Sequence, residues 1–331
     1  MTAAMEEVRE ATRTVYRDHL IALMRRDPRV ICVDSDTGLF SGVDFGSTMD
    51  RYVNLGIAEH TMMGVAAGMA ASGWRPYVNT FATFATTRAL EALQINIAYN
   101  ALPVRIMATH SGVSAGHLGP THHALNDLAV TRTLPAMTVV VPADGPSTIA
   151  LLDAVVDLPG PVYVRLGRGP TPHIPGAAAP VLGELQALRT EYDVVLVACG
   201  PRPVLAALDA ADALARYGIG AGVLHAHTVK PFDRAGLLAV TERARLVVTV
   251  EEHWLAGGLG AVVTETLCDS VPRPVLRIGL PDAFVSIVGD HDEILTAYGL
   301  TAESVANRVR RTLAGPHAAS ADQQQRGGPN G

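Results

Sequence analysis

The sequence has 331 residues, of which 48% are hydrophobic and 18% charged, and its net charge is −6. This composition is typical of a globular α/β protein and excludes a disordered or fibrous chain. The sequence contains no basic block, which excludes a nucleic-acid-binding surface.

The cysteines and the first residues indicate the cellular compartment. Cys32, Cys199 and Cys268 lie far apart without metal-binding spacing, so we expect reduced thiols in a cytoplasmic protein. Residues 1–20 predict a charged amphipathic helix rather than a secretory signal. No apolar run reaches the roughly 18 residues that a membrane-spanning helix needs.

Residues 1–168 show short β-branched runs that alternate with helical patterns. This alternation predicts a doubly wound α/β domain with a parallel sheet. The helical segments fall between the predicted strands, which are 29–36, 75–81, 103–110, 137–144 and 161–167.

A second domain of the same α/β class is predicted for residues 182–315. Four prolines make 169–181 a linker, and the polar, Gly- and Gln-rich residues 316–331 form a disordered tail. The predicted strands are 192–200, 218–229, 244–253 and 272–280, and the predicted helices are 203–216, 233–242, 258–270 and 301–313.

One predicted helix of the first domain, within "VNLGIAEHTMMGVAAGMAASG" (53–73), is apolar on every side and yet carries Glu59 near its start. A buried carboxylate is costly unless it is paired or has a chemical role. One interpretation is an acidic residue that complements the helix dipole. The other is a functional carboxylate in a buried pocket.

Polar side chains gather where the predicted strands of the first domain end. In parallel sheets, ligands bind beyond these carboxyl ends. A histidine-rich stretch, "THSGVSAGHLGPTHH", follows one of them. Its spacing matches no helical zinc motif, so proton transfer and hydrogen bonding to a substrate fit better than a metal site. The residues concerned are Asp34, Asp36, Thr80, His110, Ser111, His117, His122, His123 and Arg168.

The order of motifs resembles the transketolase family of thiamine diphosphate enzymes from about Ala11 to Leu313. "LGIAEH", "NTFATFATT", "ATHSGVSAGHLGPTHH", "VVPADG" and "VYVRLGRG" are similar to its pyrimidine-binding domain. "VKPFD", "VTVEEHWLAGGLG" and "YGLTAESV" are similar to its C-terminal domain. The activity implied is transfer of a two-carbon ketol unit from a ketose to an aldehyde.

The resemblance implies cofactor-binding roles for four residues. Glu59 would hydrogen-bond the aminopyrimidine ring of thiamine diphosphate, because burial favours a protonated, donating carboxyl group. Phe84 would stack on that ring and Phe81 would line the pocket, although plain core packing explains phenylalanines equally well. Asp34 matches an acidic residue close to the cofactor.

The resemblance also implies a substrate channel. Arg13 and Arg168 match arginines that hold a substrate phosphate, a task that suits a planar guanidinium; the alternative is a surface ion pair for each. His110 matches a histidine of the channel and His122 one nearer the reacting carbon. Glu59, His110 and His122 are therefore the expected catalytic residues.

Several positions depart from the family pattern. Leu118 replaces an acidic residue that binds a substrate hydroxyl, so selectivity for that hydroxyl is expected to be lost. Gly38 replaces a phosphate-binding serine, and Thr87 replaces an aromatic residue of the pocket. The glycines of "AGGLG", Gly257, Gly258 and Gly260, are interpreted as structural.

The Gly-Asp-Gly motif that holds Mg²⁺ and the diphosphate in the family is missing, and "VGDHDE" (288–293) lacks the second glycine. We therefore expect no metal ligands in this chain and an N-terminal partner subunit that carries the diphosphate and Mg²⁺ site, in an α2β2 assembly. The alternatives are the β subunit of a 2-oxo acid decarboxylating or acyloin-forming enzyme, and a non-catalytic stabilising subunit.

Overall fold

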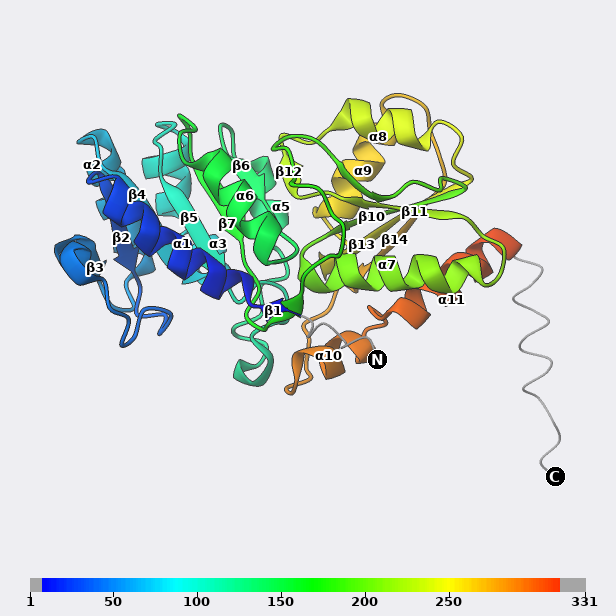
Figure 1. Ribbon diagram of the computed structural model, residues 1–331, viewed down its shortest axis with the longest axis horizontal. Coiled ribbons are helices and arrows are strands. Elements are labelled where there is room, and N and C mark those ends of the chain that lie inside the picture. The colour runs from blue at the N-terminus through cyan, green and yellow to red at the C-terminus, as the bar shows by residue number, and fades with distance from the viewer. Residues whose placement is uncertain (1–7, 316–331) are drawn as a thin grey trace, which may run out of the picture.

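A computed structural model of the chain describes residues 8–315. It contains two α/β bodies that lie side by side (Figure 1). The first is built on a seven-stranded sheet of order β12-β6-β7-β5-β4-β2-β3, and the second on a five-stranded sheet of order β14-β13-β10-β11-β9. The predicted fold class, two α/β units with parallel sheets, is confirmed. The predicted tail, 316–331, lies outside the described residues.

In the first sheet, the strands from β2 to β7 are parallel to their neighbours, whereas the edge strand β12 is antiparallel to β6. The strands are β2 (Val30–Asp34), β3 (Tyr52–Asn54), β4 (Arg75–Phe81), β5 (Arg105–Thr109), β6 (Thr138–Val140), β7 (Val162–Arg165) and β12 (Thr228–Lys230). The α-helices of this body are α1 (Thr12–Arg26), α2 (Glu59–Ala71), α3 (Ala82–Thr86), α4 (Leu90–Ala92), α5 (Asp127–Thr133) and α6 (Gly145–Val155). It also contains the 3-10 helices η1 (Gly46–Arg51) and η3 (Gly116–Leu118) and the π-helical segment η2 (Leu93–Ala98).

The second sheet is covered by α7 and α11 on one face and by α8 and α9 on the other (Figure 1). Its strands are β9 (Gln186–Arg189), β10 (Val194–Cys199), β11 (Ala221–His225), β13 (Leu246–Trp254) and β14 (Val275–Leu280). Its helices are α7 (Pro201–Ala215), α8 (Arg234–Thr241), α9 (Leu259–Cys268), α10 (His291–Ala297) and α11 (Ala302–Ala314). Central strands such as β10 are buried along their whole length, which explains their continuous apolar sequence.

The chain start and the proline-rich segment differ from the prediction. A short strand β1 (Arg9–Glu10) pairs antiparallel with β8 (Thr171–Pro172), so that helix α1 begins only at Thr12. Of the predicted helix over 1–20, residues 1–7 lie outside the described residues. The predicted linker therefore contributes one short strand, because its backbone finds hydrogen-bond partners in the segment before α1.

The single strand predicted over 218–229 is two strands in two different sheets. Residues of β11 pair with β10, whereas β12 crosses to the first body and pairs with β6. A sequence pattern records burial but not the identity of the neighbouring strand, so this exchange is invisible in the sequence. It joins the two bodies through one edge of the first sheet.

Helix α2 begins at Glu59, after a short connection that follows β3, whose last residue is Asn54. Its buried face consists of Met62, Met63, Ala66, Ala67 and Ala70. The opposite face is not buried in this chain: His60, Thr61 and Gly68 are exposed. The expected all-round burial is therefore wrong for the single chain, although Glu59 itself is buried.

The carboxyl ends of β2, β4 and β5 meet at one edge of the first sheet. The register aligns Asp34 with Asn79 and Phe81 with Thr109. The start of α2 lies at the same edge, because Leu55, just after β3, donates its backbone N–H to the Asp34 carbonyl at 3.0 Å. The sequence-predicted site residues are thus brought to one edge. Within residues 8–315, no helix is both long and apolar enough to cross a membrane.

Candidate functional site

A cavity of about 420 Å³ lies at this edge of the first sheet. It unites the ends of β2 and β4, the start of α2 and the histidine-rich stretch. The predicted residues Glu59, Phe81, Phe84 and His122 all line it, together with Ser35, Asp36, Thr37, Ile57, Arg88 and Thr121. One cavity is therefore lined by a buried carboxylate, two phenyl rings and an imidazole.

Glu59 is paired with an arginine that the sequence analysis did not single out. Arg88 donates from Nη1 to the Glu59 Oε2 at 2.8 Å, while its own side chain is 47% exposed. The same guanidinium lies 4.3 Å from the centroid of the Phe84 ring. The sequence carries no signal for this pairing, because Arg88 lies in the turn that follows α3, which ends at Thr86.

The aromatic side chains form a layered wall. Phe81 and Phe84 stack with ring centroids 5.7 Å apart and planes within 8° of parallel. His122 meets Phe84 edge-on at 5.3 Å, and His110 stacks on Phe81 at 3.9 Å. Parallel phenyl rings beside a buried carboxylate suit a flat heteroaromatic ring with a nitrogen that needs a hydrogen-bond partner.

His110 is held in an uncommon backbone conformation, with φ of 56° immediately after β5. Its Nδ1 lies 3.0 Å from the Thr109 hydroxyl and its Nε2 lies 3.4 Å from Nη1 of Arg13. Burial, then the charges of Arg13 and Arg168, lower the pKa of His110 to about 3. The ring is therefore neutral at physiological pH. Because Arg13 can only donate, Nε2 accepts and Nδ1 carries the proton.

A second cavity, of about 440 Å³, is rich in arginine. Arg13 and Arg168, both predicted, line it, and so does Arg202 from the start of α7 in the second body. Burial and the charge of Arg168, with Arg17, lower the pKa of Arg13. Its Nε is buried without a hydrogen-bond partner. The same cavity is also lined by Asp290 and Asp292, and Asp292 pairs with Arg202 at 3.2 Å. Arg13 and Arg168 repel each other, and two such cations at one cavity favour an anionic ligand.

The remaining predicted residues lie nearby in different environments. Asp34 is buried beneath the first cavity and accepts hydrogen bonds from the Thr37 hydroxyl at 2.9 Å and the Tyr52 hydroxyl at 3.2 Å, and burial raises its pKa. Its neighbours in sequence, rather than Asp34 itself, line the cavity. Leu118 is 45% exposed in η3, on the histidine-rich stretch.

The positions that depart from the family pattern have simple surroundings. The Thr87 hydroxyl donates to the Thr83 carbonyl at 2.6 Å, so it is used within its own helix turn. Gly38 has a φ of 73° and no atom within 4 Å of the position of a Cβ. The Gly260 N–H, at the start of α9, donates to the buried Glu251 carboxylate at 2.7 Å, a structural contact.

The described residues, 8–315, contain no group of three or more His, Cys, Asp or Glu side chains arranged to hold a metal ion. The acidic segment at 288–293 instead starts helix α10. Asp290 caps that helix by accepting the Asp292 N–H at 2.9 Å, and Glu293 completes a capping box.

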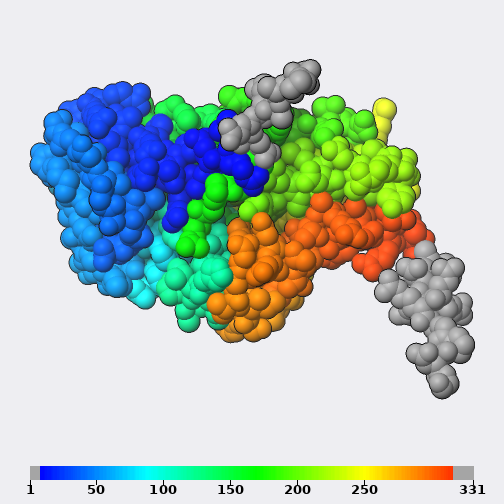
Figure 2. Space-filling view, turned by 60° about the horizontal axis from the view of Figure 1, so that its bottom comes forward, coloured from blue at the N-terminus to red at the C-terminus, as the bar shows by residue number. Residues whose placement is uncertain are grey.

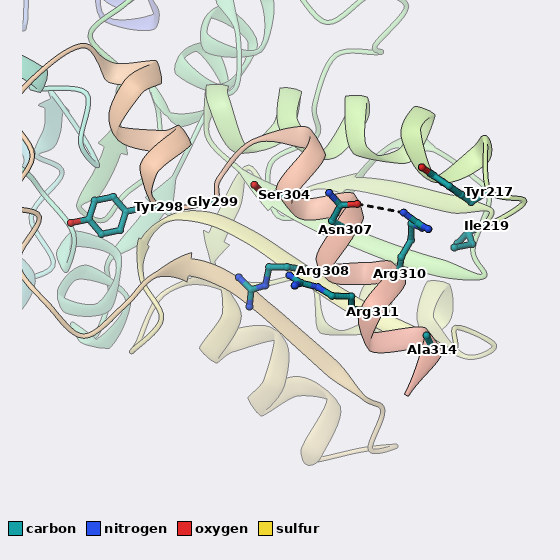
Figure 3. A pocket seen from close by; sticks show the side chains of 10 residues that line it. All are labelled: Tyr217, Ile219, Tyr298, Gly299, Ser304, Asn307, Arg308, Arg310, Arg311 and Ala314. Carbon is teal, nitrogen blue, oxygen red and sulfur yellow. Dashed lines mark hydrogen bonds between the residues drawn. The ribbon is translucent and has the colours of Figure 1, made fainter. Parts of the chain in front are cut away.

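A larger cavity, about 920 Å³, lies in the second body, far along the chain from every predicted site residue (Figure 3). Three arginines of α11, Arg308, Arg310 and Arg311, line it. Arg310 is already engaged, since it lies 3.7 Å over the Tyr217 ring and hydrogen-bonds Asn307. The two cavities of the first sheet edge, and not this one, gather the candidate chemistry.

Two consecutive parts of the chain match domains of one known protein family. The transketolase pyrimidine-binding domain matches residues 9–173, and the transketolase C-terminal domain matches residues 183–305. The chain is 38% identical over 299 residues to one of the subunits of the apulose-4-phosphate transketolase of Phocaeicola vulgatus, covering 89% of this chain and 95% of that protein. It is 37% identical over 296 residues to the 6-deoxy-6-sulfo-D-fructose transketolase subunit SqwH of Clostridium sp., covering 88% and 91%.

Solved structures show the same relationship. A split-gene transketolase described as an inactive β4 tetramer superposes with a TM-score of 0.81 at 38% identity, covering 91% of this chain and 97% of that one. A variant of the Pichia stipitis transketolase gives a TM-score of 0.79 at 26% identity, covering 94% of this chain but only 47% of that one. On its two matched domains and its identity to these subunits, the chain belongs to the transketolase family of thiamine diphosphate-dependent enzymes.

Proposed function

We propose that this chain is the C-terminal, pyrimidine-binding subunit of a two-component transketolase that transfers a two-carbon ketol unit from a ketose to an aldehyde. The observation that carries the proposal is the single cavity in which Glu59, two stacked phenylalanines and His122 meet. Two relatives with high similarity are themselves named as transketolase subunits.

The cavity fits the aminopyrimidine of thiamine diphosphate. Phe84 and Phe81 would hold the ring from its face, and the buried Glu59 would meet a ring nitrogen from the start of α2. When bound, the cofactor supplies the electron sink that cleavage of a carbon–carbon bond beside a carbonyl requires. Arg88, which donates to the Glu59 carboxylate at 2.8 Å, would help to hold that side chain at the cavity.

The two histidines would bind and orient the substrate and exchange protons with its hydroxyl groups. His110 is neutral and fixed between Thr109 and Arg13, which suits a hydrogen-bonding rather than a charged role. His122, edge-on to Phe84, lies at the cavity itself. An aromatic wall excludes water from this part of the site, which strengthens polar contacts made there.

The diphosphate and Mg²⁺ would be held mainly by an N-terminal partner subunit, in an assembly of two copies of each chain. Carboxylate and amide oxygens are the ligands that Mg²⁺ prefers. Support for a partner comes from relatives named as subunits of transketolases.

The free cysteines, two of them buried, support a reducing, cytoplasmic location.

The arginine-rich cavity would bind the phosphate or another anionic group of the donor. We expect Arg168→Ala to raise KM for a phosphorylated ketose by about 10–100-fold, because a charge-assisted bond to phosphate contributes about 1.5–3 kcal/mol. An unphosphorylated donor should be affected much less. Steady-state kinetics of the assembled enzyme with two donors that differ only in the phosphate measure this.

Arg189→Ala serves as the matched control for Arg168→Ala. Arg189 pairs with Asp212 on the surface of the second body, at 2.8 Å and outside both cavities of the site. Arg189→Ala should leave the KM values of the phosphorylated and the unphosphorylated donor unchanged. Equal losses for both donors in Arg168→Ala would mean that the arginine is structural.

Leu118 would set the acceptor. An apolar side chain cannot bind a hydroxyl beside the acceptor carbonyl, so we expect tolerance of aldehydes that lack one. Leu118→Asp should shift the ratio of kcat/KM values toward 2-hydroxyaldehydes by about 10-fold or more, and the 45% exposure of Leu118 means that the charge is tolerated. Leu118→Ala, which removes the side chain without adding an acceptor, should not shift the ratio. An unchanged ratio in Leu118→Asp would exclude Leu118 from acceptor selection.

The same position favours one alternative function. Because position 118 carries no hydroxyl-binding acid, it is also compatible with a 2-oxo acid donor, as used by decarboxylating or acyloin-forming members of the family. Turnover of pyruvate as the best donor would establish that alternative. The arginine-rich cavity favours the phosphorylated ketose.

A further inference from the structure

The histidine loop, defined as residues 111–124, carries His117, Leu118 and His122. Its two ends are tied to each other, because Gly112 donates to the Ala124 carbonyl at 3.1 Å and Ala124 donates back at 2.8 Å. Between these ends the loop contains only the short turn η3. Its shape therefore depends on what it packs against.

The C-terminal body supplies that surface. Glu252, near the end of β13, is buried, and its Oε1 accepts the Val113 N–H at 2.6 Å and a hydrogen bond from His291 Nε2 at 2.9 Å. At Gly112, where φ is +62°, a Cβ would overlap the Glu252 carboxylate. The carboxylate thus occupies the space that a side chain at the first turn of the loop would need.

The segment before α10 makes the second contact with the loop. At Gly116, where φ is +56°, a Cβ would lie 2.9 Å from the Gly289 carbonyl oxygen. Figures 1 and 2 both show the α10 region against the part of the first body that contains η3. The loop is therefore packed, backbone on backbone, against the segment that carries His291.

Arg165 connects the end of the histidine loop with the strand that carries Glu252. This buried side chain donates from Nη2 to the Glu252 carbonyl at 2.9 Å and to the Ala124 carbonyl at 3.2 Å. Its Nε and Nη2 also bind the Asp127 carboxylate, at 2.7 and 3.0 Å. The end of the loop and the strand of Glu252 share one fixed guanidinium.

We propose that Glu252 and His291 are positioning residues of the C-terminal body, which hold the histidine loop in the shape that presents Leu118 and His122 to the substrate. Glu252 lines neither cavity of the site, whereas His291 lines only the arginine-rich one. Their effect on turnover rests on the proposed function, whereas their effect on the loop does not. In this proposal, the acidic segment at 288–293 holds the histidine loop in place rather than binding a metal ion.

The charges of this pair support the geometry. Burial opposes both charges, yet the Glu252 carboxylate raises the pKa of His291, while His291 and Arg165 lower the pKa of Glu252. Arg202 and Asp292 act on His291 with opposite signs, and His123 adjoins the pair. A raised histidine pKa means that this contribution to stability is present below the ordinary value of 6.5 and is lost as pH rises through the raised pKa.

The first experiment is hydrogen–deuterium exchange of the full chain, read by mass spectrometry over peptides of the histidine loop. Glu252→Gln keeps the size of the side chain but removes its charge, and it should speed exchange of the loop about 10-fold or more. His291→Gln should also speed exchange of the loop, and it leaves the side chains of the buried strand β13 unchanged. In the unsubstituted chain, loop protection corrected for intrinsic rates should fall above the His291 pKa, and His291→Gln should abolish that dependence.

Glu251→Gln is the matched control. It makes the same chemical change one residue earlier on β13, in a buried carboxylate that accepts from Leu259 and Gly260 at the start of α9 and not from the loop. It should leave exchange of the loop at the unsubstituted rate. Unchanged loop exchange in both Glu252→Gln and His291→Gln would overturn the proposal, whatever happens to stability.

The second readout uses the assembled enzyme. Glu252→Gln should lower kcat about 10-fold for phosphorylated and unphosphorylated donors alike, because it displaces the loop rather than an anion contact. Arg168→Ala, by contrast, acts on KM of the phosphorylated donor. Faster loop exchange with unchanged kcat would overturn the positioning role and leave the proposed function intact. Failure of the unsubstituted assembly to transfer ketol units would contradict the proposed function. Hydrogen–deuterium exchange would still test whether Glu252 and His291 hold the histidine loop.

Discussion

The purified chain is expected to show no transketolase turnover by itself and to gain Mg²⁺-dependent activity when the diphosphate-binding subunit is added. The physical reason is the proposed division of the cofactor site: the described residues hold no group of three or more side chains arranged for a metal ion, and the cavity of Glu59 would take the pyrimidine part of the cofactor. The increase should be from background to full activity, the largest effect predicted here.

Titration of the chain with its partner measures this effect. Thiamine diphosphate affinity should rise with activity, and light scattering should give the mass of an α2β2 assembly. The mass of the isolated chain, measured in the same way, is the reference; a solved relative of this chain is described as an inactive β4 tetramer. Full Mg²⁺-dependent turnover by this chain alone would refute the two-component proposal.

Glu59→Gln in the assembled enzyme is expected to slow deuterium exchange at C2 of bound thiamine diphosphate by on the order of 10²-fold or more. The substitution keeps the shape of a buried side chain but removes the acid function. It also removes the charge that Arg88 pairs with at 2.8 Å. Quenched-flow exchange followed by NMR of the extracted cofactor measures the rate.

Glu303→Gln is the control for this substitution, since Glu303 is an exposed first-turn acid of α11. It should leave the exchange rate unchanged. If Glu59→Gln lowered Tm by weakening the start of α2 but left the exchange rate near that of the unsubstituted enzyme, Glu59 would act on the helix dipole alone.

The sequence by itself determined the class of the protein and the edge of the sheet at which to look. Strand–helix alternation indicates a doubly wound sheet, and the carboxyl ends of parallel strands share an edge, which predicts that Asp34, Thr80 and His110 lie at that edge. The motifs around Glu59 indicated the family, which the comparisons confirmed. These are local or periodic properties, which a linear pattern records directly.

Only the tertiary structure decided which distant residues meet. The pairing of Glu59 with Arg88, the placement of Arg202 beside Arg168, and the contact of Glu252 with Val113 join residues 29, 34 and 139 positions apart. Burial of charge requires a partner, but the identity of that partner depends on how elements that are distant in the sequence pack, which periodicity does not encode. For the same reason residues 218–229 looked like one strand, although β12 had to cross to the first sheet to find its hydrogen-bond partner.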